Sequence, residues 1–145
     1  MRALPVRLYL YSKTFKTHTI HSIFSYGDIQ ELPEVAIAYF YAGAKASVLE
    51  DLAKTHQGII LVGSGSGNYN LEWQNTIEKL SKEGIFFVRA SRVPAGLIFE
   101  DGVFDPSNVC IPANTLSPQK ARVLLMLALS KTKDLAQIKS IFEQY

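Results

Sequence analysis

Hydrophobic residues in the middle of the chain fall into three short runs, with stretches of mixed polarity between them. Residues 35–41, 58–62 and 85–89 are almost continuously apolar and have glycines nearby, which is typical of strands buried on both faces. The stretches between the runs repeat apolar residues at helical spacing, and the second carries Trp73 and Leu80 on one side. This β-α-β-α-β order predicts a three-layer α/β fold, a small parallel sheet flanked by helices on both faces.

Polar residues and glycines predict where the first helix begins and ends. Ser47 and Glu50 have the spacing of a capping box, which opens a helix at this point. Gly58 supplies the stop for that helix and also begins the second apolar run. A glycine-rich loop over residues 63–70 then separates the second run from the second helix.

Two further helices are predicted at the C-terminal end. Ser117 and Pro118 have the N-cap and first-turn chemistry of a helix that ends near Thr132, and Asp134 caps a last helix. The earlier helix is apolar nearly all round at residues 123–129, whereas a helix between a sheet and water should be amphipathic. It must therefore be covered on more than one side, either by the last helix or by a partner subunit or absent domain.

Two segments lack regular periodicity. Residues 1–33 contain β-forming residues without a helical period, which favours an extended connector with one edge strand, followed by the α/β domain over residues 34–145. Residues 92–113 contain three prolines and two glycines between short apolar pieces, which predicts a long loop or an irregular hairpin. Loops of this length in compact domains often carry function.

Composition excludes several classes of function. The 145 residues have a net charge of +2 and scattered basic residues, so we expect no nucleic-acid or membrane partner. Cys110 is the single cysteine, which rules out an internal disulfide and a thiolate metal cage. The longest apolar run is far shorter than the ~20 residues of a membrane span. Arg7 and Lys13 interrupt the apolar core that a signal peptide needs, so a cytoplasmic location is expected for this chain.

The loop Gly63-Ser-Gly-Ser-Gly-Asn68 is the first candidate for chemistry, because open parallel sheets bind ligands at the carboxyl ends of their strands. Its spacing departs from the G-x-G-x-x-G of dinucleotide folds, and no G-K-[ST] follows as in a P-loop. Ser64 and Ser66 lack the context of a nucleophile elbow, and the three histidines all precede them, against the hydrolase order. By itself the loop is as consistent with a structural turn as with a ligand site.

The remaining reactive side chains do not form a recognisable centre. His18 and His21 have a metal-ligand spacing but no second pair of ligands nearby, so no metal site is expected. Cys110 is interpreted as a small, partly buried apolar residue. Asp101 and Asp105 are candidates for a carboxylate pair, although solvated loop acids are the commoner case. We therefore expect no cofactor and no complete catalytic constellation within this chain.

Three blocks of sequence are more specific together than any one of them. They are Gly63-x-Gly-x-Gly-Asn68, then Val88-Arg-Ala-Ser-Arg-Val-Pro-Ala-Gly96, then the segment that begins Leu116-Ser-Pro-Gln-Lys-Ala-Arg and closes with Ile141-Phe-Glu-Gln-Tyr145. In this order and spacing they resemble the C-terminal domain of bacterial L-asparaginase, in the asparaginase/glutaminase family. The resemblance begins near residues 16–19 and covers nearly the whole chain.

The resemblance implies half of an enzyme. In that family the N-terminal domain carries the two nucleophilic threonines and the lysine and aspartate that activate one of them, within T-G-G-T and D-G-T-D-type segments. Neither segment occurs in this sequence. The family's C-terminal domain closes the active site of a neighbouring subunit in a homo-oligomer and gives an asparagine and a glutamate to the amino-acid end of the substrate. No catalytic residue is therefore assigned to this chain.

Position by position, the family's asparagine falls on Asn68, which becomes the substrate-binding candidate. An amide both donates and accepts hydrogen bonds, so it suits a zwitterionic substrate. The glutamate is expected seven residues after Gly96 and falls on Val103, which cannot attract an ammonium group. Unless the carboxylate of Glu100 or Asp101 contacts the ammonium group instead, this departure favours a relaxed substrate preference or a chain no longer selected for catalysis.

The sequence therefore predicts the C-terminal half of an L-asparaginase-like amidohydrolase, present as a truncated product or a separate reading frame and inactive alone. Its expected partners are an N-terminal asparaginase domain or a neighbouring subunit, and the parent enzyme could be periplasmic. The alternative is a free-standing small-ligand-binding or assembly module without catalysis. A nucleotide-binding module is the third and weakest hypothesis.

Overall fold

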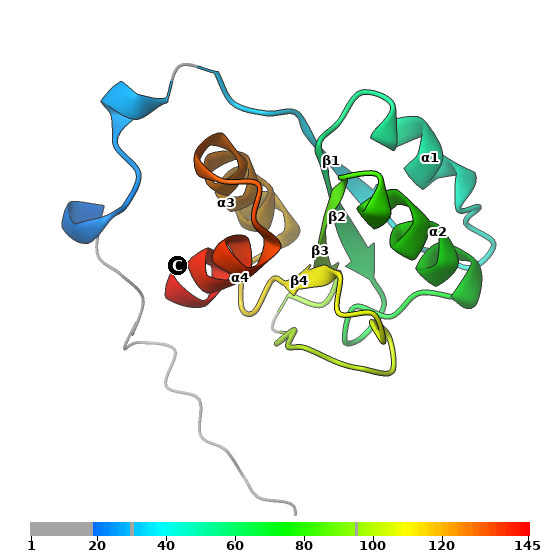
Figure 1. Cartoon of the computed structure of the whole chain (residues 1–145). Helices are drawn as coiled ribbons and strands as arrows, with labels where there is room; N and C mark the ends of the chain where they lie inside the picture. The colour runs from blue at the N-terminus through cyan, green and yellow to red at the C-terminus, as the bar shows by residue number, and fades with distance from the viewer. Residues whose placement is uncertain (1–18, 30, 95) are drawn as a thin grey trace, which may run out of the picture.

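Four parallel strands form the sheet in a computed structural model that describes residues 19–29, 31–94 and 96–145. The strands lie side by side in chain order and are β1 (Val35–Tyr39), β2 (Gly58–Gly63), β3 (Phe86–Ser91) and β4 (Cys110–Pro112). The helices are α1 (Ser47–Ala53), α2 (Leu71–Lys82), α3 (Pro118–Lys131) and α4 (Leu135–Gln144). Because α1 and α2 each connect two parallel strands, the predicted β-α-β-α-β order is confirmed (Figure 1).

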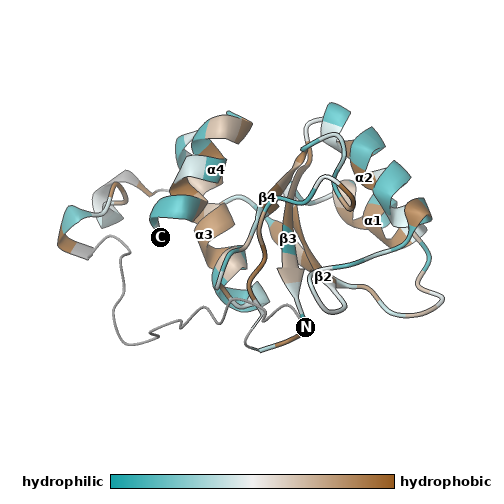
Figure 2. Ribbon diagram, turned by 90° about the horizontal axis from the view of Figure 1, so that it is seen from below, coloured by the Kyte–Doolittle hydropathy of each residue, from teal (hydrophilic) through white to brown (hydrophobic). Residues whose placement is uncertain are grey.

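Helices cover both faces of the sheet, which confirms the three-layer α/β fold. The pair α1 and α2 packs on one face and the pair α3 and α4 on the other (Figure 1). The strands are mostly hydrophobic, whereas the outer surfaces of the helices carry the polar residues (Figure 2). Two apolar clusters result, one between the sheet and each pair of helices.

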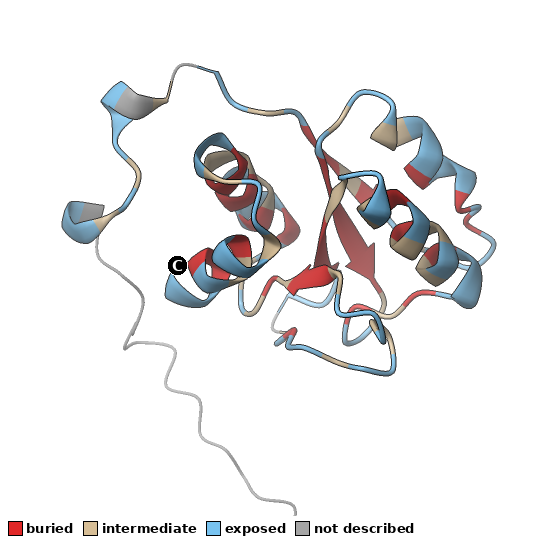
Figure 3. Ribbon diagram, viewed as in Figure 1, coloured by how far each residue is buried: buried red, intermediate tan, exposed pale blue. Residues whose placement is uncertain are grey.

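The continuous apolar runs belong to strands that are buried on both faces. All six residues of β2 are buried, as the red strands of Figure 3 show. Ile59 and Leu61 belong to the cluster beneath α1 and α2, whereas Ile60 and Val62 belong to the cluster beneath α3 and α4. A strand in this position needs apolar side chains at every residue, which explains the absence of alternation in the sequence.

The signals predicted for the ends of α1 are wrong. The N-cap residue is Ala46, which makes no side-chain capping bond, and Ser47 is the first helical residue. The Glu72 carboxylate of α2 instead accepts a hydrogen bond from the Ala46 backbone N–H at 3.1 Å. Gly58 is the first residue of β2, and a Cβ there would lie 2.7 Å from Leu125 Cδ2. The residue types at Ala46 and Gly58 are therefore explained by contacts with α2 and α3 rather than by local capping of α1.

The other helix starts follow ordinary capping chemistry. The side chains of Asn70, Ser117 and Asp134 accept backbone N–H bonds at the first turns of α2, α3 and α4. The predictions for α3 and α4 are thus confirmed, and Pro118 occupies the first turn of α3 as expected.

The segment predicted as one long loop, residues 92–113, ends in a fourth strand. Cys110–Pro112 pair in parallel with residues 87–89 of β3. Three residues are too few to show a period, and a proline usually argues against a strand. Here Pro112 is the last residue of a strand at the edge of the sheet, where a missing N–H can be tolerated.

Helix α3 packs on β1, β2 and β3 and also on α4, so the last helix supplies part of the predicted cover. Val123 nevertheless remains 53% exposed. It lies in an open groove, the α3 groove, whose apolar lining also includes Leu116, Leu124, Leu127 and Tyr145. None of the helices in the described ranges is long and apolar enough to cross a membrane.

The segment before β1 holds two short 3-10 helices, Thr19–His21 and Tyr26–Asp28, and no strand among its described residues. It is tied to the C-terminus where the Tyr145 hydroxyl accepts a hydrogen bond from Ile23 N at 2.8 Å. Much of the stretch in which an edge strand was predicted, residues 6–18, lies outside the described residues.

Candidate functional site

The glycine-rich loop after β2 is a tight turn closed by backbone pairing. Ser64 and Asn68 exchange two N–H···O bonds of 3.1 and 2.8 Å. Gly65 and Gly67 adopt φ values of 50° and 83°, the left-handed region that favours glycine. A Cβ on Gly63 would lie 2.2 Å from the carbonyl carbon of Gly67. The glycine spacing is thus required by close approach of the backbone to itself.

This turn places Asn68 at the carboxyl end of β2, one of the two central strands. The side chain is half-buried, and its Oδ1 atom is fully buried without a hydrogen-bond partner among the described residues. Buried polar atoms are rarely left unpaired in folded proteins. Asn68 therefore lies at the edge where parallel sheets bind ligands, with an acceptor that this part of the chain does not satisfy.

The loop between β3 and β4 is held beside the glycine loop by two side chains. Arg89 of β3 donates from Nη2 to the carbonyl oxygen of Phe99 at 2.5 Å. The hydroxyl of Tyr69, which follows Asn68 directly, donates to the carbonyl oxygen of Phe104 at 2.7 Å. Burial raises the pKa of Tyr69 well above its usual range, so the hydroxyl keeps its proton and remains a donor.

Asp105 anchors the same loop from within. Its carboxylate accepts hydrogen bonds from the backbone N–H of Val109 at 3.0 Å and of Cys110 at 2.8 Å, directly before and at the start of β4. Asp101 accepts from the N–H of Val103 at 2.9 Å. The two acids considered as a carboxylate pair are therefore used separately, each in shaping the loop backbone.

Glu100 and Val103 occupy the region where the family resemblance places a glutamate. The Glu100 carboxylate forms an ion pair of 3.0 Å with Lys139 on α4. Val103 is 77% exposed. Both Glu100 and Asp101 thus have partners within the described chain, and an apolar side chain faces solvent where an acid was expected.

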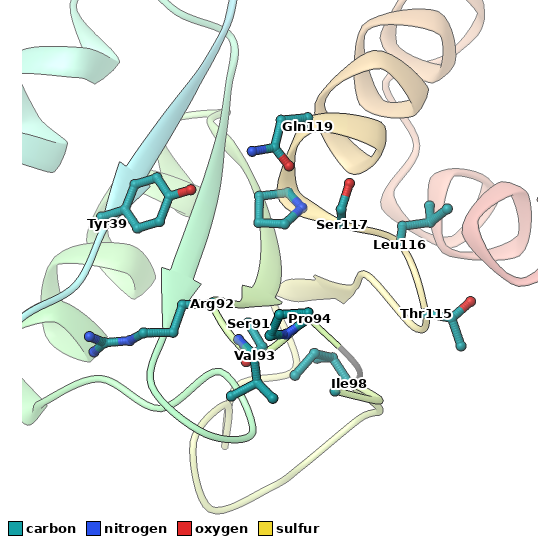
Figure 4. A pocket seen from close by; sticks show the side chains of 12 residues that line it. Tyr39, Ser91, Arg92, Val93, Pro94, Ile98, Thr115, Leu116, Ser117 and Gln119 are labelled. Atoms are coloured by element: carbon teal, nitrogen blue, oxygen red, sulfur yellow. Dashed lines mark hydrogen bonds between the residues drawn. The ribbon is translucent and has the colours of Figure 1, made fainter.

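A cleft of about 230 Å³ opens at the same edge, between the ends of β1 and β3 and the start of α3 (Figure 4). Tyr39, Ser91 and Gln119 are among its polar lining residues. The Ser91 hydroxyl donates to the carbonyl oxygen of Gly65 at 2.5 Å, which ties the wall of the cleft to the glycine loop.

The described residues bring no base to the side chains of Ser64 and Ser66. No hydrogen bond joins the side chains of Ser64 or Ser66 to another described residue. His56 precedes β2 at the opposite edge of the sheet, where its Nδ1 lies 3.0 Å from the carbonyl oxygen of Leu52. His21 belongs to the first 3-10 helix, and His18 lies outside the described residues. The serines therefore show no sign of activation as nucleophiles.

Cys110 is more deeply buried than the partly buried apolar residue that was predicted. It is 3% exposed, and burial, with a smaller effect of the Asp105 carboxylate, raises the pKa of its thiol to about 12. A neutral thiol of this kind is a poor nucleophile and a poor metal ligand. Within the described ranges, no three His, Cys, Asp or Glu side chains converge as a metal site would require.

Sequence reasoning missed the residues that hold the two loops together, above all Arg89 and Tyr69. One signal was available, because Arg89 is a charged residue inside an otherwise apolar strand. A buried charge is costly unless it has a specific partner, so its position predicts an interaction that the pattern of apolar residues does not. The partner itself, a backbone carbonyl ten residues later, is not encoded in any spacing.

The fold and the site define a class of protein: a parallel α/β domain with a glycine turn and a braced loop at its ligand-binding edge. The family model of the Glutaminase/Asparaginase C-terminal domain matches residues 34–142. The chain therefore belongs to the glutaminase/asparaginase family, which confirms the resemblance seen in its sequence.

Individual relatives agree with this assignment. The chain is 41% identical over 130 residues to "Probable L-asparaginase periplasmic" of Haemophilus influenzae and 41% identical over 134 residues to "L-asparaginase 2" of Escherichia coli. These alignments cover 88% and 90% of this chain but only 37% and 38% of the relatives. The crystal structure of a probable cytoplasmic L-asparaginase from Campylobacter jejuni matches with a TM-score of 0.85 and 35% identity, covering 94% of this chain and 43% of that one.

Proposed function

We propose that this chain supplies the C-terminal half of an L-asparaginase-like amidohydrolase, with Asn68 contacting the amino-acid end of the substrate. The observation that carries the proposal is the position of Asn68, at the carboxyl end of a central parallel strand, with a buried Oδ1 that no described residue satisfies. The names of the relatives, which are L-asparaginases and glutaminase-asparaginases, indicate the substrate class. Val103 favours a relaxed preference at the ammonium end of that substrate.

The chemistry of the proposed reaction needs groups that the described residues do not bring together. L-asparagine and water would give L-aspartate and ammonia, with a threonine attacking the side-chain amide and hydrogen-bond donors holding the oxyanion. The chain spans well under half the length of the relatives it matches, so another polypeptide segment would provide this threonine. The family resemblance favours a homo-oligomer, in which this half closes the site of a neighbouring subunit.

The proposal is tested by ammonia release from L-asparagine. The chain alone should be inactive, whereas a chimera joining it to the N-terminal portion of the Haemophilus influenzae relative should be active, because that portion would supply the nucleophile. A control chimera should carry the relative's own C-terminal portion across the same junction. Ammonia release by the pure chain alone, or an inactive chimera beside an active control, would each contradict the proposal.

An assembly module without catalysis is the second candidate, and the α3 groove favours it. This groove is open, almost wholly apolar and lined by Val123 and Leu127. Large open apolar surfaces usually mark contact with another polypeptide. Two results together would support this second function over the first: the chain forms a homo-oligomer, and the chimera does not hydrolyse an amide.

We propose a cytoplasmic location for this chain. A longer parent enzyme would be compatible with the periplasm, the compartment named for the Haemophilus influenzae relative. Fractionation of cells that express the chain at its native level, followed by immunodetection, would decide between the two compartments.

A further inference from the structure

Arg89 is a buried cation at the base of the candidate site. It is 3% exposed, although it lies in β3 between apolar neighbours. Its aliphatic part packs directly beneath the glycine turn, because a Cβ on Gly67 would lie 3.0 Å from Arg89 Cγ. Tyr69, two residues after Gly67, is buried as well. Arg89 therefore forms part of the floor under the loop that presents Asn68.

The guanidinium of Arg89 is only partly satisfied. Nη2 donates to Phe99, whereas Nη1 is buried without a hydrogen-bond partner among the described residues. No carboxylate in the described ranges forms an ion pair with it. A buried charge without a counter-charge generally opposes folding. Stability alone is thus a poor explanation for an arginine at this position.

The contacts of Arg89 link the two loops of the site. Its side chain touches the glycine turn through Gly67 and holds the other loop through the carbonyl of Phe99. The next residue after Phe99 is the first of the two acids considered for the ammonium end of the substrate, Glu100. A single buried residue therefore spans from the loop that carries Asn68 to the acidic segment.

We propose that Arg89 is a positioning residue, which fixes residues 99–101 relative to Asn68 and so sets the geometry of the substrate end of the site. Side chains on irregular loops keep a defined geometry only when supporting residues lock the backbone. Tyr69 adds a second tie through Phe104, but that contact lies further along the loop. The functional part of this inference rests on the proposed function, whereas its structural part does not.

The test compares Arg89→Met with Arg122→Met in the full chain. Arg122 is the matched control because its Nε also donates to a backbone carbonyl, that of Val35, but on the other side of the sheet. Hydrogen exchange is followed at two bonded loop amides, Ile98 and Asp105, with Val88 of β3 as reference. These amides report the loop directly, without any need for activity.

Arg89→Met should speed exchange at Ile98 and Asp105 by about tenfold relative to Val88, with a melting temperature within about 3 °C of wild type. Arg122→Met should leave the exchange rates of Ile98 and Asp105 relative to Val88 unchanged. Arg89→Lys should restore much of the protection of the two loop amides, since an ammonium can still donate to the Phe99 carbonyl. Unchanged exchange in Arg89→Met, a uniform increase at all three amides, or failure of that variant alone to fold would overturn the proposal.

The functional readout uses the chimera described above. Arg89→Met should raise the KM for L-asparagine about tenfold with a smaller change in kcat, because a misplaced substrate end weakens binding first. Arg122→Met should leave both constants near wild type. An inactive wild-type chimera would refute the proposed function, while the exchange data would still decide the structural role of Arg89. Equal effects of the two variants on KM would refute the positioning role.

Discussion

The two loops at the carboxyl edge of the sheet are stabilised in different ways. The glycine loop, residues 63–70, is held mainly by backbone atoms, through the Ser64–Asn68 pairing and the contact of Gly63 with Gly67, with one side-chain bond from Ser91. The loop between β3 and β4 is held by side chains, chiefly Arg89 and Tyr69 from outside the loop and Asp105 from within it. At the carboxyl ends of the strands, the glycine loop therefore depends on glycines at fixed positions. The neighbouring loop depends on contacts between residues that are far apart in the sequence.

The comparison also explains what could be predicted from sequence. The glycine loop and Asn68 were correctly expected after the second strand, because strands buried on both faces require continuous apolar runs and tight backbone-paired turns require glycine. Gly63 itself proved to be the last residue of β2. The loop after β3 was not resolved, because a bond such as Tyr69 to Phe104 joins residues 35 apart and leaves no local pattern. β4 was missed because it has only three residues, and the capping box at Ser47 was overridden by Glu72.

The largest expected effect is at Gly63. Gly63→Ala should destabilise the domain by about 3 kcal/mol or more, because the new Cβ would meet backbone atoms at 2.2 Å that cannot move without breaking the turn. Urea unfolding gives the free energy. Gly102→Ala is the control in the other loop, where no atom lies within 4 Å of the added Cβ. Equal losses for both variants would contradict the distinction between the loops.

A smaller loss is expected at Asp105. Asp105→Ala should cost about 2 kcal/mol, because two backbone N–H groups at the start of β4 lose a charged acceptor. Asp101→Ala removes one bond, to Val103, in a more exposed part of the loop and should cost less than about 1 kcal/mol. Urea unfolding of both variants measures the difference, and a reversed order would show that Asp105 does not anchor β4.

Alkaline pH should destabilise the fold through Cys110, the first residue of β4, where the side-chain-held loop ends. The folded-state pKa of Cys110, about 12, exceeds its ordinary value of 9.0, so the folded chain keeps a proton that the unfolded chain loses. The corresponding stability is present below pH 9 and is lost as pH rises from 9 towards 12, by on the order of 1 kcal/mol at pH 10. Tyr69 acts in the same direction above its ordinary value of 10.0.

Unfolding measured at pH 8 and pH 10 checks this prediction. Cys110→Ala should remove most of this loss between pH 8 and pH 10, about half a proton on average over the interval. Any change in packing that the substitution causes should lower stability equally at both pH values. Identical pH slopes for wild type and Cys110→Ala would show that the thiol is not protonated selectively in the folded state.

The smallest effect is expected at Lys139. Lys139→Met should cost about 0.5 kcal/mol, because Glu100 is 61% exposed and its ion pair is screened by solvent. The hydrogen bonds from Lys139 to Asn108 fix the position of the Lys139 side chain but are expected to stabilise the fold only slightly. Added salt should narrow the gap between wild type and variant in urea unfolding. A loss above about 2 kcal/mol would mean that α4 is a main support of the loop.

The central claim is that Asn68 contacts the substrate while another segment performs the chemistry. The most direct test is steady-state hydrolysis of L-asparagine by the chimera and by its Asn68→Ala variant, with Ser66→Ala as an exposed control in the same loop. Loss of the Asn68 amide should raise KM about tenfold or more, corresponding to one or more lost hydrogen bonds, and leave Ser66→Ala near wild type. Wild-type KM and kcat in Asn68→Ala would contradict the account.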